Sequence, residues 1–328
     1  MTRLSRRAVL RAAGVAGLGL IAGCGRLPWQ AAARVPRIGL LGQASAGSAS
    51  SREAFFQSLH ESGYVDGQNI LIESRPEPDM APELAALPVN VIVADGARAA
   101  LAAKHATTSI PIILGFSSID PVAEGLVSSL ARPGGNITGV TANVQGAQFG
   151  AKRLELLRDA LPRLTRLGVL WDAGDPATTA RWGELQAVGE SLGIETLSLV
   201  VRAADEVAAA LDAAASAHLD ALIVLHNTLT QSRRTMITDH VASSRLPAMY
   251  EFREWASGGG LMSYGPSAAA MWHRAGQYVD KVLKGASPAD LPVEQPRQFQ
   301  FVINLQTAQA LGLTIPQHVL LQATEIIQ

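Results

Sequence analysis

Polar, charged and aromatic residues end or follow short apolar runs throughout this chain, and their types suit the binding of a small polar molecule. A carboxylate accepts a charge-assisted hydrogen bond from a ligand amine, and an amide both donates and accepts. In open α/β sheets, ligands bind at the carboxyl ends of the strands. We therefore expect most of these residues to line one binding site. They are Gln43, Ser45, Asp95, Gly96, Ser117, Ser118, Asp120, Trp171, Asp172, His226, Asn227, Tyr250, Glu251 and Tyr264.

Several of these candidates have a structural alternative. Trp171 could stack on a planar ligand, worth roughly 0.5–1.5 kcal/mol beyond area burial, or it could pack in the core. Asp172 could hold a ligand amine or cap the next turn. His226 fits a structural residue at a strand end as well as a proton carrier.

Catalytic and metal-binding patterns are missing from the sequence. There is no His-Glu-x-x-His motif, and the run from Gly115 to Ile119 lacks the closing glycine of a Gly-x-Ser-x-Gly elbow. The seven histidines show no metal-ligand spacing, and no Gly-x-Gly-x-x-Gly opens a helix after residue 24. We expect no catalytic residue, no metal and no cofactor.

The stretch 110–140 combines an apolar run with signals for a following helix. Residues 110–114 have the character of a buried strand, and Asp120 followed by Pro121 is a typical helix start. Apolar residues at helical spacing then run to Leu130, before a Pro-Gly-Gly stop at 133–135. This pattern predicts a strand, a binding loop and a helix, or alternatively an ordinary capped connection.

Strand and helix patterns alternate from residue 36 onward, which is typical of parallel sheets covered by helices. The predicted strands are 37–41, 69–73, 89–94, 110–114, 166–171, 194–200, 219–225, 247–250, 261–264 and 299–303. The predicted helices are 51–62, 84–87, 97–106, 150–160, 176–192, 205–217, 229–243, 267–283 and 306–311. The alternation restarts near residue 150. We expect an α/β fold of two doubly wound parallel-sheet lobes, joined by a hinge of several strands.

The lobe boundaries follow from three breaks near residues 143–150, 257–260 and 292–298. Residues 36–145 plus 259–292 are predicted to form lobe 1, so Tyr264 would return to that lobe. Residues 146–258 plus 293–328 are predicted to form lobe 2. Two sheets that face each other across a hinge enclose a cleft, where a ligand would bind.

The N-terminus reads as an export signal rather than part of the fold. Four arginines precede a short apolar run at 12–23, and residues 21–24 resemble a lipobox that ends in Cys24. We expect residues 1–23 to be removed, Cys24 to carry a lipid, and residues 24–35 to form a tether. A plain secretory signal and an uncleaved anchor are the alternatives. The Arg6-Arg7 pair also fits a twin-arginine signal, so the export route stays open.

The 328 residues include 48% hydrophobic and 17% charged residues, with a net charge of −1. A chain of this length and composition can bury a large core. It lacks the basic surface on which nucleic-acid binding depends, so no nucleic-acid partner is expected.

Several runs resemble a known family in order and spacing. They are residues 59–69, 120–122, 131–139, 152–157, 259–265, 288–296, 303–305 and 311–316. Together they span nearly all of the chain after the tether. The chain resembles the bacterial ABC-transporter substrate-binding proteins that include tryptophan- and tyrosine-binding members, which have the type I periplasmic-binding-protein fold.

The resemblance implies an extracytoplasmic solute receptor whose two lobes close around one small molecule. It implies a partner permease with its cytoplasmic ATPase, and an aromatic amino acid as a possible ligand. A monomer anchored to a membrane through Cys24 is expected. The alternatives are a ligand sensor for a membrane signalling partner without transport, and an exported α/β enzyme.

Overall fold

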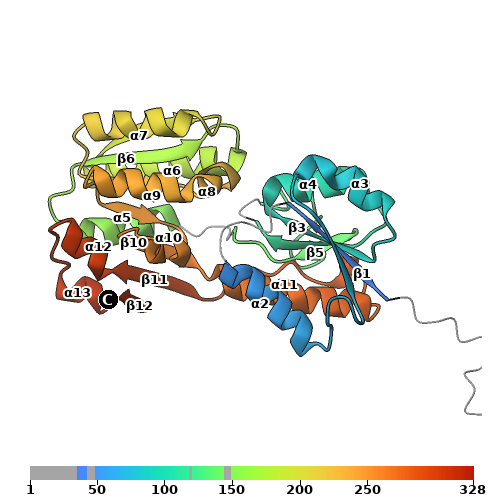
Figure 1. Cartoon of the computed structure of the whole chain (residues 1–328). Helices are drawn as coiled ribbons and strands as arrows, with labels where there is room; N and C mark the ends of the chain where they lie inside the picture. The colour runs from blue at the N-terminus through green and yellow to red at the C-terminus, as the bar shows by residue number, and fades with distance from the viewer. Residues whose placement is uncertain (1–34, 43–48, 118–119, 144–148) are drawn as a thin grey trace, which may run out of the picture. The chain divides into compact units, whose positions relative to one another are not determined.

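A computed structural model describes residues 35–42, 49–117, 120–143 and 149–328. Almost all of them belong to one compact unit, Pro36–Gln328, which contains two β-sheets, each flanked by helices (Figure 1). Nearly all neighbouring strands in both sheets are parallel. The predicted α/β fold with two parallel-sheet lobes is confirmed. Within the described residues, no helix is long and apolar enough to span a membrane.

The first sheet has five strands in the order β2-β1-β3-β4-β5, all parallel. Its inner strands β1, β3 and β4 are buried almost throughout, which explains their continuous apolar sequences. The strands are β1 (Arg37–Leu41), β2 (Leu71–Arg75), β3 (Val91–Asp95), β4 (Ile112–Phe116) and β5 (Ile137–Gly139). This sheet and its helices are called the five-stranded lobe below.

Helices cover both faces of the first sheet. Helices α2 (Ala49–Glu61) and α11 (Ala268–Leu283) pack against each other on one face (Figure 1). Helices α3 (Ala81–Ala86) and α4 (Gly96–Ala106) lie on the other, preceded by the short 3₁₀ turn η1 (Pro78–Met80). Gly276 permits the close approach of α11 to α2, because a Cβ atom there would lie 2.7 Å from the Ser58 Cβ.

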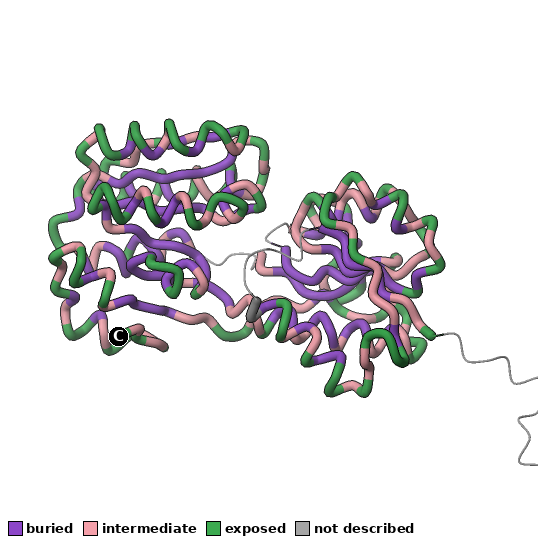
Figure 2. The backbone as a smooth tube through the Cα atoms, viewed as in Figure 1, coloured by how far each residue is buried: buried purple, intermediate pink, exposed green. Residues whose placement is uncertain are grey.

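The second sheet has seven strands in the order β12-β11-β10-β9-β8-β6-β7, and only the pair β10–β11 is antiparallel among those described. Its strands are β6 (Arg166–Asp172), β7 (Glu195–Val201), β8 (Ala221–Val224), β9 (Ala248–Tyr250), β10 (Met262–Pro266), β11 (Phe299–Asn304) and β12 (Glu325–Ile327). Its helices are α5 (Phe149–Ala160), α6 (Pro176–Leu192), α7 (Glu206–Ser216), α8 (Thr228–Ser232), α9 (Arg234–Ser243), α10 (Arg253–Ser257), α12 (Leu305–Ala310) and α13 (Gln317–Leu320). This group is called the seven-stranded lobe. Figure 2 shows that the inner strands of both sheets are largely buried.

Helix α6 illustrates how local sequence sets an element's limits. The Asp175 side chain accepts a hydrogen bond of 2.9 Å from the Ala177 backbone N, and Pro176 takes the first helical position. Gly193 ends the helix with a left-handed φ of 70°. The predicted helix 176–192 therefore has the observed bounds.

The helix predicted after Asp120 is wrong. Asp120 does cap the chain, since its Oδ1 accepts hydrogen bonds from the backbone N atoms of Val122 (2.9 Å) and Ala123 (3.1 Å). The chain then forms turns, with Gly125 at a φ of 62°. The Val127 N donates to the Pro121 carbonyl at 3.0 Å, six residues earlier, and not to a carbonyl four residues earlier as in an α-helix. This wider loop buries its apolar residues without a helix.

The predicted return of Tyr264 to the first lobe is also wrong. Strand β10 contains Tyr264 and pairs with β9 and β11 in the second sheet. Leu261 and Met262 are buried in the core of that lobe, which fixes β10 there. After β10 the chain returns to the five-stranded lobe, where it forms α11. The remaining predicted domain limits stay predictions.

Two connecting segments run side by side next to β5. Val140 forms a parallel bridge with Glu294, and the Thr141 N donates to the Glu294 carbonyl at 2.9 Å. Arg274 of α11 holds the Glu294 side chain with two hydrogen bonds of 2.8 and 2.6 Å. The Gln295 Nε2 donates to the Asn143 carbonyl at 2.9 Å. These contacts bind the two connections together where they leave the five-stranded lobe.

Candidate ligand-binding site

The predicted residues of the five-stranded lobe lie at or after the carboxyl ends of β3 and β4. Asp95 ends β3 and is half-buried, and Gly96 opens α4 with a φ of 86°. Ser117 follows β4, is 1% exposed, and its carbonyl accepts hydrogen bonds from Thr141 Oγ1 (3.1 Å) and the Ala142 N (2.6 Å).

Of the four other candidates of this lobe, the structure describes only Asp120. Asp120 is half-buried and caps the turn described above. Gln43, Ser45 and Ser118 lie outside the described residues. Their ligand contacts therefore stay predictions.

Two predicted residues of the seven-stranded lobe form a buried polar pair. The Asn227 Nδ2 donates to the Asp172 Oδ2 at 2.6 Å, and the Gly174 backbone N donates to Oδ1 at 2.7 Å. Asp172 and Asn227 are 8% and 7% exposed. Asn227 also caps α8, accepting a hydrogen bond from the Thr230 N at 3.0 Å. Residues 55 positions apart thus meet where β6 and β8 end.

A second charged group lies at the same edge and includes two residues that the sequence analysis did not select. The Glu251 carboxylate follows β9 and is contacted by Arg153 of α5 (3.4 Å) and Arg181 of α6 (2.5 Å). The side chains of Arg153 and Glu251 are 3% and 4% exposed, whereas that of Arg181 is 19% exposed. The His226 backbone N donates to the same carboxylate at 3.2 Å.

The charge state of Glu251 follows from this arrangement. Burial raises the pKa of the Glu251 carboxyl group, but the nearby Arg153 and Arg181 guanidinium groups outweigh burial and lower it below the usual 4.5. Glu251 is therefore ionised at neutral pH. We call Arg153, Glu251 and Arg181 the charge triad.

A pattern in the sequence could have identified both arginines. Arg153 lies on the same helix face as Leu156, Leu157 and Ala160, all of which are buried. Arg181 follows the buried Thr178 by three positions on α6. An arginine at an apolar position of a helix needs a buried acidic partner, and the structure shows that this partner is Glu251.

Three aromatic rings meet at the ends of β4, β8 and β9. The Phe116 ring contacts His226 (centroids 5.8 Å apart) and Phe252 (5.0 Å), and His226 contacts Phe252 (4.6 Å), all edge to face. The His226 Nδ1 is buried and has no hydrogen-bond partner among the described residues. Burial lowers the pKa of His226 to about 4, so the imidazole is neutral at pH 7.

Trp171 packs inside the seven-stranded lobe. Its ring stacks on Trp182, with centroids 6.0 Å apart and planes inclined by 10°, and its Nε1 donates to Ser198 Oγ at 2.9 Å. The structure thus satisfies the indole N–H and covers one ring face without a ligand. Ligand stacking by Trp171 stays a prediction.

Tyr250 and Tyr264 also pack among aromatic neighbours. Tyr250 is fully buried and stacks on Trp255 at 4.8 Å, while its hydroxyl has no partner among the described residues. Tyr264 is half-buried, 6.2 Å from the ring of Phe299. Neither residue belongs to the polar pair or the charge triad.

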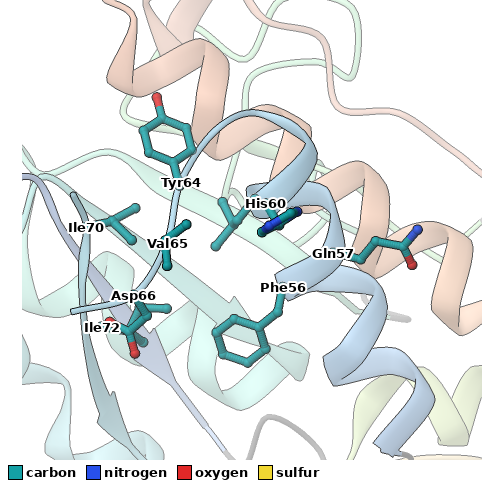
Figure 3. A pocket seen from close by; sticks show the side chains of 9 residues that line it. Phe56, Gln57, His60, Tyr64, Val65, Asp66, Ile70 and Ile72 are labelled. Atoms are coloured by element: carbon teal, nitrogen blue, oxygen red, sulfur yellow. The ribbon is translucent and has the colours of Figure 1, made fainter. Parts of the chain in front are cut away.

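A separate apolar pocket lies between the end of α2 and the edge strand β2, with a volume of about 360 Å³ (Figure 3). Phe56, Ile70 and Ile72 are among its apolar lining residues, and the polar residues Gln57, His60, Tyr64 and Asp66 also line it. It lies near the start of β2, away from the carboxyl ends of the strands. The described residues contain no group of three or more histidines, cysteines and acidic residues suited to a metal ion.

Comparisons with known proteins give a consistent picture. The sequence model of a family described as ABC transporter substrate binding protein matches residues 46–327. A tyrosine-binding protein of Clostridioides difficile is 27% identical over 270 residues, which cover 80% of this chain and 76% of that protein.

Solved structures extend the likeness to three dimensions. The complex of an ABC domain with L-Trp from Streptococcus pneumonia aligns with a TM-score of 0.81 at 27% identity, covering 89% of this chain and 99% of that one. A conserved domain protein from Vibrio cholerae aligns with a TM-score of 0.80 at 23% identity, covering 89% and 100%. The second likeness concerns the fold alone.

Proposed function

The chain belongs to the family of ABC transporter substrate-binding proteins, and from this premise we propose that it binds an aromatic amino acid for import. Members of this family are extracytoplasmic receptors that bind a small molecule and deliver it to an ABC transporter. The protein is therefore a solute receptor. We further propose that it has no enzymatic activity and that its partner is an ABC permease with a cytoplasmic ATPase.

The buried pair of Asp172 and Asn227 is the observation that carries this proposal. A carboxylate that is 8% exposed and contacted by the neutral groups of Asn227 and Gly174 can still accept a charge-assisted hydrogen bond from a ligand amine. It lies at the carboxyl edge of a mostly parallel sheet, where α/β proteins bind ligands. Asp95, Gly96 and Ser117 would contribute the contacts from the five-stranded lobe.

The aromatic part of the ligand is supported by both sequence relatives and side chains. One relative is a tyrosine-binding protein, and a similar solved structure contains L-Trp. Phe116 and Phe252 lie at the strand ends that lead to the site. A ring packed against them would gain roughly 0.5–1.5 kcal/mol beyond area burial.

A thermal-shift screen tests the ligand class directly. L-Trp, L-Tyr and L-Phe are compared with aliphatic amino acids, nucleosides and sugars. A ligand at a hundred times its dissociation constant stabilises the folded protein by about 2.7 kcal/mol. Stabilisation by sugars or nucleosides, with none by an aromatic amino acid, would overturn the proposed ligand.

A matched pair of variants tests the site. Asp172→Asn should weaken binding of the aromatic amino acid about tenfold or more, because the charge-assisted bond is lost. Asp175→Asn is the control, since Asp175 lies three residues further on and caps α6. Equal affinities of the two variants would remove Asp172 from the site.

We also propose that the receptor is a monomer held outside the cytoplasm by lipid on Cys24. The lipobox-like residues 21–24 support this anchor. Two acyl chains on one cysteine suffice for stable membrane attachment. Cys24→Ser expressed in a bacterium should move the protein from the membrane fraction to the soluble fraction, and full membrane retention of this variant would exclude the anchor.

A further inference from the structure

The carboxyl edge of the seven-stranded lobe carries two ionic groups of opposite sign. The charge triad contains two guanidinium groups and one carboxylate, so its formal charge is +1. The neighbouring Asp172 carboxylate has a formal charge of −1, and its hydrogen-bond partners within the described part of the chain, Asn227 and Gly174, are neutral. Buried charges without an opposite partner are costly, so both groups favour a ligand that supplies the missing charges.

Arg181 is the member of the triad that a ligand can reach. Arg153 is 3% exposed, and its Nε donates to the Tyr264 carbonyl at 2.8 Å, which directs it inward. The Arg181 side chain is 19% exposed. Its bonds to Ala177 O (3.1 Å), Glu251 Oε1 (2.5 Å) and His226 O (2.9 Å) use three of its five N–H groups. Within the described residues, one N–H on each terminal nitrogen has no hydrogen-bond partner, and a ligand carboxylate can accept from two such donors.

The two ionic groups are held by consecutive residues. His226 accepts from Arg181 through its backbone carbonyl, and Asn227 donates to Asp172 through its side chain. The two groups therefore contact the same stretch of chain after β8, through adjacent residues. The α-ammonium and α-carboxylate groups of an amino acid are likewise close together, on one carbon atom.

Glu184 adds a negative charge that acts on Arg153, the triad member directed inward, so the positive charge that a ligand can reach is that of Arg181. The His226 ring adds no positive charge at neutral pH, because burial lowers its pKa to about 4. Glu251 stays ionised beside its two arginines, because their charges hold its pKa below the usual value. At physiological pH the triad therefore keeps its carboxylate and its two guanidinium groups, beside a neutral His226 ring.

We infer that Arg181 and Asp172 are the two ionic anchors of an α-amino acid zwitterion, with Arg181 binding the carboxylate and Asp172 the ammonium group. This inference rests on the proposed function and narrows it. The site then requires both charges on the ligand, and an aromatic acid without an amine or an aromatic amine without a carboxylate binds poorly.

Three indole compounds distinguish the contributions of the two anchors to ligand binding by the purified, unaltered protein. L-tryptophan carries both charges, tryptamine lacks the carboxylate, and indole-3-propionate lacks the amine. Calorimetry should show that each truncated compound binds at least about tenfold more weakly than L-tryptophan, because each leaves one buried charge unpaired. Similar affinities for L-tryptophan and either truncated compound would overturn the inference.

Two variants then assign each anchor. Arg181→Gln should weaken the binding of L-tryptophan about tenfold or more. It should weaken the binding of tryptamine less than about threefold, because tryptamine has no carboxylate for Arg181 to contact. Asp172→Asn should weaken the binding of L-tryptophan by a similar factor and leave the affinity for indole-3-propionate nearly unchanged. Arg181→Lys, which keeps the charge, should restore part of the affinity. An equal loss for all three compounds in Arg181→Gln would show a merely structural role for Arg181.

The outcomes also distinguish this inference from the proposed function. If no aromatic amino acid binds the unaltered protein, the proposed function fails and the zwitterion site fails with it. If aromatic amino acids bind but the truncated compounds bind equally well, only the zwitterion site fails. The comparison among compounds needs no variant, so a misfolded variant leaves the test decisive.

Discussion

Replacing Arg153 with methionine removes the most deeply buried cation of the charge triad. Methionine fills a similar volume in α5 but leaves Glu251 with Arg181 as its remaining cationic partner in the triad. Breaking a buried ion pair by removing one partner costs roughly 3–5 kcal/mol of folding stability, because the other charge stays buried. The variant also leaves the Tyr264 carbonyl without the Arg153 Nε donor at 2.8 Å. Since Arg181 still neutralises Glu251, we expect a loss near the lower end, about 3 kcal/mol.

Differential scanning calorimetry measures this loss against a control on the same helix. Lys152→Met removes an exposed pair with Glu155 (2.8 Å) and should cost about 0–1 kcal/mol. The unfolding entropy is about 2.1 cal/mol/K per residue, so in a chain of 328 residues each kcal/mol lowers Tm by roughly 1.5 °C. Arg153→Met should therefore melt about 4–5 °C below the unaltered protein.

The effect should also depend on pH with a definite sign. The pKa of Glu251 is lowered in the folded protein, so its stabilising contribution is present above the usual pKa of 4.5 and is lost as the pH falls through the lower folded value. The stability difference between Arg153→Met and the unaltered protein should therefore shrink in acid. Equal melting temperatures of Arg153→Met and Lys152→Met at pH 7 would refute this account of the triad.

Three further changes give independent checks. His226→Phe should keep the edge-to-face ring contacts and abolish one acid-sensitive component of stability. The pKa of His226 in the folded protein is about 4, below the ordinary 6.5, so the unaltered protein loses stability as the pH falls from 6.5 to 4. Urea unfolding across pH 4–7 measures this loss, which His226→Phe should not show. Gly139→Ala should destabilise the protein far more than Gly67→Ala, because a Cβ at 139 would lie 2.5 Å from the Leu114 carbonyl oxygen. A Cβ at Gly67 has open space, so Gly67→Ala should cost only about 1–2 kcal/mol of stability for the positive φ. Similar melting temperatures of the two variants would contradict this. Trp171→Phe should lower Tm, because it weakens the stack on Trp182 and removes the Nε1 hydrogen bond to Ser198. In calorimetry, a tenfold loss of affinity for L-tryptophan would place Trp171 in the binding site, and an affinity within about twofold would exclude ligand stacking.

The sequence by itself determined the order and type of most elements, because the signals involved are local. Asp175, Pro176 and Gly193 act within a few residues of the chain, and they delimit α6 in the structure as predicted. The family resemblance also follows from runs of neighbouring residues, and the match over residues 46–327 confirms it. Asp172 and Asn227 were selected for the same reason: each follows an apolar strand, and parallel strands end at a common edge.

Only the tertiary structure decided features that depend on distant partners. The sequence signals after Asp120 favoured a helix, but burial of the apolar residues of that segment against the sheet is achieved by a turn with Gly125 at positive φ. The sheet that β10 joins depends on which core buries Leu261 and Met262. The roles of Arg153 and Arg181 required Glu251, which lies 98 and 70 residues further along the chain. Local patterns cannot contain such information, because a buried charge is stable only where folding brings its partner within a few ångströms.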